Sequence, residues 1–216
     1  MELLIVIALI AILSVAVLAT INPIEQSNKA RDARVQNDAA EIMNAAERYY
    51  ASVSKYPWES FADDLTSADA VVLSSIKMGF GICNGTGNPA TDSNSDLDAT
   101  SCSATDENPN LLISTSELKS SFAGKDEFQP VLDGKLDQGL WLAKQANENA
   151  FYVCYIPKAN ANRVVDDKMR CIFASGEVAK IGGDCIKATG DDWSTTANDG
   201  PEAIMATAAV LRCVPE

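Results

Sequence analysis

An acidic loop in the middle of the chain carries the pattern closest to metal chemistry. Four oxygen-bearing side chains alternate along it: Asp92, Asn94, Asp96 and Asp98. Positions 1, 3, 5 and 7 of a calcium-binding loop alternate in the same way. Leu97 stands where such a loop needs glycine, and Ser103 replaces its closing glutamate. A solvated loop is therefore the favoured interpretation, with Ca²⁺ as the alternative here and at the acidic residues of the segment 191–199.

Other kinds of chemistry find little support in the composition. The 216 residues include no histidine, which excludes a catalytic triad or metal site built on imidazole. No carboxylate pair or nucleophile stands in a recognisable catalytic setting, so we expect no enzymatic activity. Asn84-Gly-Thr86 is an N-glycosylation triplet, although such triplets are frequent by chance. Acidic residues outnumber basic ones by 24 to 12 in residues 59–216, a balance that predicts a soluble part that repels nucleic acid.

The N-terminal run is the most unusual element of the sequence. Residues 3–21 contain only Ser14 and Thr20 as polar side chains, and a helix of that length spans about 28 Å. A helix that is apolar on all sides must be surrounded by lipid or protein. Glu2 precedes the run, and the first basic side chain is Lys29, an arrangement that argues against an ordinary secretory signal. Glu2 either lies in water at the membrane interface or pairs with an α-amino group when such helices pack together.

The stretch "ELLIVIALIAIL" resembles the start of type IV pilins and of the pseudopilins of type II secretion. The resemblance covers the apolar run and the amphipathic helix after it, including the ending "RYYASVSKYPW". It implies that Glu2 pairs with the N-terminus of a neighbouring subunit, at Met1 in this numbering, during assembly. The usual residues before the glutamate and the basic leader with its glycine cleavage site do not occur. Either the numbering begins at a trimmed or misassigned start, which we favour, or this member has an unusual N-terminus.

The resemblance also implies a function and a place of action. It implies a structural subunit that waits in the inner membrane, meets pilus assembly machinery and polymerises with identical copies into an extracellular pilus. A type II secretion pseudopilin is the alternative within the family. A membrane-anchored surface protein that binds a partner and never polymerises is the alternative from another class. An ordinary anchor would tolerate leucine at Glu2, whereas an assembly helix would not.

The sequence divides the chain into three parts: residues 1–23, 24–56 and 57–216. Pro23 removes a helical hydrogen bond and disfavours a helical Asn22, so we expect a kink near residues 19–24. The second part is predicted to be an amphipathic helix, because eight apolar residues recur at spacings of three and four: Val35, Ala39, Ile42, Met43, Ala46, Tyr49, Tyr50 and Val53. The aromatic residues around Pro57 suggest either core packing, which we favour, or a conductive stack.

The third part is predicted to be an α+β head. Helices are expected at 59–78 and 111–122, and strands at 140–144, 151–157, 169–174 and 177–181, the last two joined by a tight turn at 174–176. The whole fold is then a long helix, kinked near Pro23, packed on a small antiparallel sheet, which is the lollipop that the resemblance implies.

Six cysteines, none in a CxxC pair, favour disulfides over free thiols in an exported domain. Cys83 and Cys102 bound one polar loop. Cys154 and Cys171 face each other if their strands are antiparallel neighbours. These two assignments leave Cys185 with Cys213, a pair that the resemblance supports because many pilins close a C-terminal loop with a disulfide. The predicted pairs are therefore Cys83–Cys102, Cys154–Cys171 and Cys185–Cys213.

Overall fold

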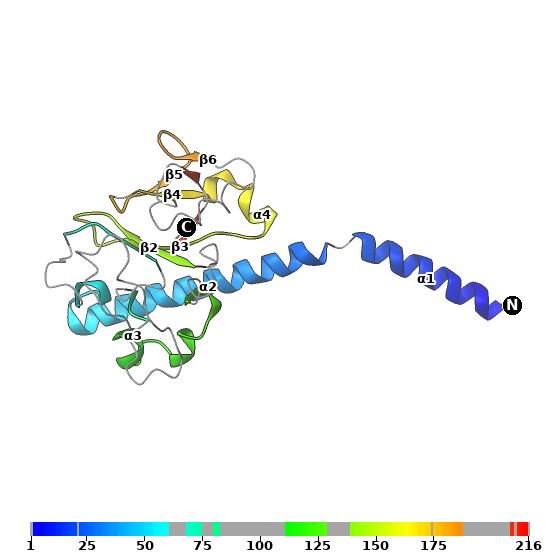
Figure 1. Ribbon diagram of the computed structural model, residues 1–216, viewed down its shortest axis with the longest axis horizontal. Coiled ribbons are helices and arrows are strands. Elements are labelled where there is room, and N and C mark those ends of the chain that lie inside the picture. Colours follow the sequence, from blue (N-terminus) through cyan, green and yellow to red (C-terminus); the bar gives the residue numbers. More distant parts are fainter. Residues whose placement is uncertain are drawn as a thin grey trace.

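A computed structural model shows a projecting N-terminal helix and a mixed α+β head (Figure 1). It describes residues 2–20, 22–60, 68–74, 80–82, 111–128, 139–173, 175–187, 208–209 and 211–215. Helix α1 (Glu2–Thr20) extends away from the head with the N-terminus at its far end, while α2 (Pro23–Val53) runs along the head. The mixed fold class predicted from the sequence is confirmed at this level.

The predicted interruption near Pro23 is present. Helix α1 ends at Thr20 and α2 begins at Pro23, which occupies the first helical turn, where its missing N–H costs nothing. Asn22 has the extended conformation that a following proline favours, and its side-chain oxygen accepts a hydrogen bond from the backbone N–H of Glu25 at 3.2 Å. Proline and an N-cap together therefore make the chain start a new helix here.

Helix α2 buries one face against the head, as its spacing predicts. Five of the eight predicted apolar positions are buried: Val35, Ala39, Ile42, Ala46 and Tyr49. Met43 is partly buried against the same core, whereas Tyr50 and Val53 remain exposed near the end of the helix. Ser54 ends α2 in the left-handed conformation, and its N–H donates to the carbonyl oxygen of Tyr50. The helix thus ends shortly before Pro57, close to the predicted boundary.

A four-stranded antiparallel sheet packs on α2. Its strands are β1 (Val71–Ser74), β2 (Leu140–Lys144), β3 (Phe151–Tyr155) and β8 (Arg212–Val214), in the order β1-β2-β3-β8. Every residue of β2 is buried, as is nearly all of β3, because one face of these strands meets α2 and the other meets a second cluster around Trp141 and Ile172. The sheet therefore lies between two apolar layers.

Smaller elements complete the head around this sheet. Strands β4 (Arg170–Ile172) and β5 (Val178–Lys180) form a hairpin, and β6 (Ile186–Lys187) pairs in parallel with β7 (Ala208–Ala209). The short helices α3 (Leu111–Ser114) and α4 (Asn160–Arg163) lie beside α2, and single 3₁₀ turns occur at 57–60, 120–122, 126–128 and 166–168.

The predicted turn between β4 and β5 is present, and its glycine is indispensable. Gly176 has φ +76°, and its N–H donates to the carbonyl oxygen of Phe173. A Cβ at this position would lie 1.9 Å from the carbonyl oxygen of Lys144 at the end of β2. The glycine is therefore required both by the backbone conformation and by the close approach of the hairpin to the sheet.

Two helical predictions are corrected within the described residues. Residues 71–74 of the segment expected to be helical form β1, which pairs with β2 in register from Val71 opposite Lys144 to Ser74 opposite Trp141. The run "VVLS" is rich in β-branched side chains, and pairing with β2 outweighs its helical spacing. In the segment 111–122, helix α3 stops at Ser114 and a separate 3₁₀ turn spans Ser120–Phe122.

Two of the predicted disulfide pairings are wrong. The structure joins Cys154 to Cys213 and Cys171 to Cys185, not Cys154 to Cys171 or Cys185 to Cys213. The prediction assumed that β4 is the neighbour of β3, but β8 occupies that place and sets Cys154 directly opposite Cys213. Strand β4 pairs with β5 instead, and the chain then returns so that Cys185 meets Cys171. Cys83 and Cys102 lie outside the described residues.

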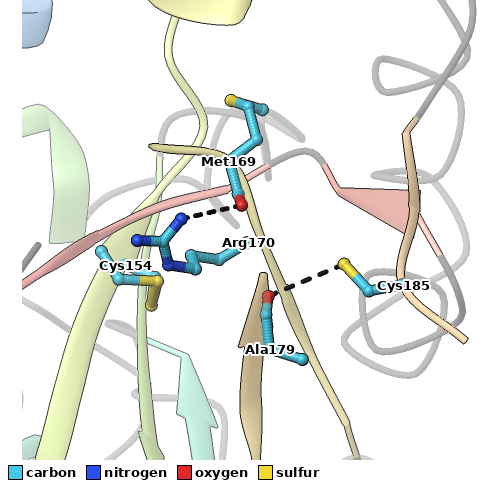
Figure 2. The surroundings of a disulfide bond; sticks show 6 residues. Cys154, Met169, Arg170, Ala179 and Cys185 are labelled. Carbon is cyan, nitrogen blue, oxygen red and sulfur yellow. Dashed lines mark hydrogen bonds between the residues drawn. A yellow bond between two sulfur atoms is a disulfide. The ribbon is translucent and has the colours of Figure 1, made fainter. Parts of the chain in front are cut away.

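The segment that carries Cys185 folds back against the β4–β5 hairpin. The sulfur of Cys185 lies 3.7 Å from the carbonyl oxygen of Ala179 in β5, and both residues are marked in Figure 2. In the same view, the guanidinium of Arg170 donates to the carbonyl oxygen of Met169 at 3.0 Å. The backbone of Arg170 also pairs with Leu211 just before β8, so β4 connects the hairpin to the edge of the main sheet.

Candidate assembly surface

Helix α1 presents an apolar surface to its surroundings. Ten large apolar side chains are between 51% and 76% exposed: Leu3, Leu4, Ile5, Val6, Ile7, Leu9, Ile10, Ile12, Leu13 and Val15. They occur at nearly every position, so they cover all sides of the helix rather than one stripe. Exposed apolar surface of this extent is typical of sites that other molecules cover. We call residues 2–20 the assembly helix.

Ser14, the one polar side chain inside the exposed apolar surface from Leu3 to Val15, is hydrogen-bonded within the helix. Ser14 donates its hydroxyl to the carbonyl oxygen of Ile10 at 2.7 Å, within the helix, so it places no unsatisfied polar group on the apolar surface. Within the described residues, no helix combines the length and the apolarity that crossing a membrane requires.

Glu2 occupies the first turn of α1 and is exposed. A carboxylate in this position interacts favourably with the positive end of the helix dipole. The side chain is also available to a cation on another molecule, which is the role that the sequence suggests for it. Met1, the second predicted assembly residue, lies outside the described residues. Pro23, also predicted to act in assembly, is exposed and begins α2 on the other side of the break.

The first half of α2 is joined to the head by two carboxylates that receive consecutive backbone N–H groups. Asp32 accepts from the N–H groups of Lys158 and Ala159 at 2.8 and 3.0 Å, and from the side-chain amide of Asn162 at 2.8 Å. Glu25 accepts from the N–H groups of Asn160 and Ala161, both at 3.1 Å. Together the two carboxylates satisfy the start of α4, whose own N-cap residue makes no side-chain hydrogen bond. We call these two residues and the segment 158–162 the carboxylate clamp.

The two carboxylates of the clamp differ in their surroundings. Asp32 is 1% exposed and also lies 3.5 Å from the guanidinium of Arg31. Glu25 is half-buried, and the N–H groups of Ala161 and Asn160, followed by the positive charges of Lys29 and Arg163, hold its pKa below the usual range for glutamate. The charged form of Glu25 is therefore the one that binds the head.

Ion pairs continue this attachment along α2. Arg34 meets both Glu127 and Asp126, at 3.0 and 3.2 Å. Lys125 contacts the buried carboxylate of Asp38 and lies 3.6 Å above the ring of Phe122. These pairs connect α2 to the segment 120–128, on the opposite side of the helix from the sheet.

Near the C-terminal end of α2, Arg48 binds the segment that follows α3. Its guanidinium contacts the carboxylate of Glu117 and that residue's carbonyl oxygen, each at 2.8 Å.

The predicted aromatic cluster forms a stack at the C-terminal end of α2: Tyr50 on Tyr56, and Tyr56 on Trp58, each with ring centres 4.5 Å apart.

The aromatic stack also joins α2 to the sheet. Phe151 of β3 meets the rings of Tyr56 and Trp58 edge-on, and the hydroxyl of Tyr56 donates to the carbonyl oxygen of Asn149 at 3.2 Å. Burial raises the pKa of Tyr56 above its ordinary value. The rings of Tyr56 and Trp58 pack in the core, in agreement with the interpretation that the sequence favoured, while Tyr50 covers them from the solvent side.

The remaining predicted site residues fall outside the described part of the chain. These are the oxygen ligands Asp92, Asn94, Asp96 and Asp98, the second acidic segment 191–199, and the glycosylation residue Asn84. Among the residues that are described, no cluster of three or more histidine, cysteine, aspartate or glutamate side chains is arranged to hold a metal ion. Both the Ca²⁺ sites and the glycan therefore stay predictions.

The sequence did not predict the clamp, nor the buried ion pair between Asp38 and Lys125. Asp32 and Asp38 interrupt the apolar face of α2, and both are buried, although carboxylates on a helix usually lie in water. Their position offered a signal, since Asp32 and Asp38 flank Val35 at a spacing of three residues and therefore share its face. Their partners are the backbone and side chains of segments about 90 to 130 residues later, which no local pattern reveals.

Comparisons of this chain with models of protein families, with characterised proteins and with solved structures gave no significant match.

Proposed function

We propose that this protein is the structural subunit of an extracellular filament of the type IV pilus kind, polymerised through its assembly helix. The observation that carries the proposal is that the apolar side chains of α1 are exposed on all sides of the helix. Helix α2, in contrast, is packed against the head. Each large apolar side chain of α1 contributes about 1.5–3 kcal/mol when it is fully buried. Ten of them together provide a strong driving force for association with other apolar helices.

Identical copies of the chain are the partners that suit this helix best. A single partner surface covers one side of a helix, whereas a bundle of parallel α1 helices covers every side. The break between Thr20 and Pro23 separates the bundled helix from the head, so heads can lie outside while the apolar helices gather inside. Before assembly, α1 needs another apolar environment, and the inner membrane supplies it in this proposal.

Glu2 would be the charged group of this bundle. A carboxylate among apolar helices must find a cation, because an unpaired buried charge costs several kcal/mol. The first basic side chain is Lys29, on the far side of the break. An α-amino group of a neighbouring copy therefore remains as the cation that the core of the bundle can supply, in keeping with the family that the sequence resembles.

The test is filament formation by the Glu2→Leu variant in cells that carry the assembly machinery. We expect normal amounts of membrane-associated protein and no filaments in electron micrographs of sheared material. Glu41→Gln is the matched control, because Glu41 is an exposed carboxylate on α2, and it should assemble normally. Normal filaments from Glu2→Leu would contradict the role of Glu2. If the unaltered protein forms none, the non-polymerising surface protein becomes the better interpretation.

The location of the filaments separates the two members of the family. Filaments on the cell surface are expected for a pilus subunit, whereas short periplasmic assemblies would indicate a secretion pseudopilin. Immunogold labelling of the head on intact and on permeabilised cells distinguishes these outcomes.

A further inference from the structure

The clamp determines where α2 becomes attached to the head. Asp32 is the first buried residue of α2. Before it, the helix reaches the head through Glu25 and through Arg31, which donates to the carbonyl oxygen of Ile156 at 3.4 Å. Ile24, beside Glu25, is 71% exposed. The first turns of α2 therefore have little apolar packing and depend on polar contacts for their position.

Glu25 and Asp32 make the same kind of contact in two different environments. Each accepts two backbone N–H groups of the segment 158–161 with its two oxygens. Asp32 is closed off from solvent by the head, while Glu25 is only partly buried. A carboxylate that solvent can still reach can take up a proton without global unfolding, and protonation removes both the charge and part of its capacity to accept hydrogen bonds.

We propose that Glu25 is a proton-releasable latch that sets the position of the joint between the assembly helix and the head. With Glu25 charged and bound, the joint lies just before α2, whose N-cap is Asn22. With Glu25 protonated, the first turns of α2 detach and the joint moves toward Asp32, which remains as the inner anchor. Residues 23–31 would then join the free part of the chain, a length of about 13 Å as a helix.

The charged groups around Glu25 support the direction of this switch. Lys29 lies one turn further along α2, and Arg163 lies on α4. Arg31, Asp32 and Lys158 complete the charged groups of the clamp. Because the bound form of Glu25 is the charged one and its pKa is lowered, the latch holds above the ordinary pKa of glutamate and opens as pH falls through the lower, folded-state pKa.

Backbone amide exchange, measured by NMR on the full chain in detergent micelles, tests the latch residue by residue. At pH 7 the amides of Asn160 and Ala161 should be protected, and Glu25→Gln should raise their exchange rates about tenfold, because a charge-assisted acceptor is lost. The amides of Lys158 and Ala159 should keep their protection, since Asp32 still receives them. The control Glu41→Gln should change none of the four.

The pH dependence distinguishes a proton-controlled latch from a purely structural contact. In the unaltered protein, protection at Asn160 and Ala161, corrected for intrinsic exchange, should fall as pH is lowered from 6 toward 3. In Glu25→Gln this dependence should disappear. Equal protection in the variant and the unaltered protein at pH 7, or the same pH dependence in both, would overturn the proposal. The measurement uses unassembled protein, so its outcome is independent of whether the chain forms filaments.

Discussion

Helices α1 and α2 follow each other in the chain and meet opposite environments. The apolar side chains of α1 from Leu3 to Val15 are exposed, whereas α2 lies between the sheet and α3 and buries its apolar face (Figure 1). The more apolar helix is thus the one left uncovered by its own chain. In the proposed function, α2 serves attachment within one molecule and α1 serves association between molecules.

The chemistry of the two helices differs in the same sense. Helix α2 is attached by directed contacts: the clamp at Glu25 and Asp32, and the ion pairs of Arg34, Lys125 and Arg48. Such contacts fix one orientation, because each needs a particular partner at a particular distance. Apolar burial is not directional, so α1 can pack with several neighbours at once and does not need a unique partner within the head.

The largest difference between the helices is expected when a buried side chain of α2 and an exposed side chain of α1 are each replaced by alanine. Asp32→Ala leaves one buried and two half-buried donors without their acceptor, so the head should lose about 3–5 kcal/mol of stability toward unfolding. Leu9→Ala in α1 should leave that stability unchanged, because Leu9 is exposed. Denaturant unfolding in detergent, followed by the fluorescence of the buried Trp58 and Trp141, measures both. A loss of head stability in Leu9→Ala would break the comparison.

The disulfides extend the comparison to the head, because both lie in apolar clusters separate from the one that packs on α2. Removing Cys154–Cys213, which closes a longer loop, should cost about 4 kcal/mol, and removing Cys171–Cys185 about 3 kcal/mol. Cysteine pairs replaced together by serine and compared in denaturant give both values. Non-reducing peptide mapping checks the pairing itself: a peptide that joins Cys154 to Cys171 would contradict the structure. Neither replacement should affect the helicity of α1.

The aromatic end of α2 should respond to alkaline pH. Tyr56→Phe removes the hydrogen bond to Asn149 and should cost about 1 kcal/mol at pH 7. The raised pKa of Tyr56 means that the unfolded chain releases the tyrosine proton first. Stability is therefore complete below pH 10 and declines as pH rises from there through the folded-state pKa. The variant should show a smaller decline, and equal declines in both proteins would exclude Tyr56 as the source.

The smallest effect is expected at an exposed ion pair of α2. Arg48→Met breaks the contacts with Glu117 but keeps most of the side-chain length. Because the guanidinium is half exposed, the loss should be about 0.2–1 kcal/mol and should shrink further in high salt. Thermal melting at two salt concentrations measures it. A loss comparable to that of Asp32→Ala would mean that α2 is attached mainly at its C-terminal end.

The sequence alone determined the features that depend on neighbouring residues. The apolar length of α1, the interruption at Pro23 and the buried stripe from Val35 to Tyr49 could be predicted because helical spacing and proline geometry act within a few residues. The same holds for β2 and β3, and for the turn at Gly176. The absence of a polar face on α1 is equally local, because apolar residues occupy nearly every position of the helix.

Only the tertiary structure decided which distant segments became neighbours. Strand β8 lies next to β3, so Cys154 meets Cys213 and the predicted pairing with Cys171 fails. Residues 71–74 become a strand because β2 is available to pair with them. Asp32 can be buried because the N–H groups of Lys158 and Ala159 arrive from a segment more than 120 residues away. In each case the deciding energy comes from a partner far along the chain, whose position a local pattern does not contain.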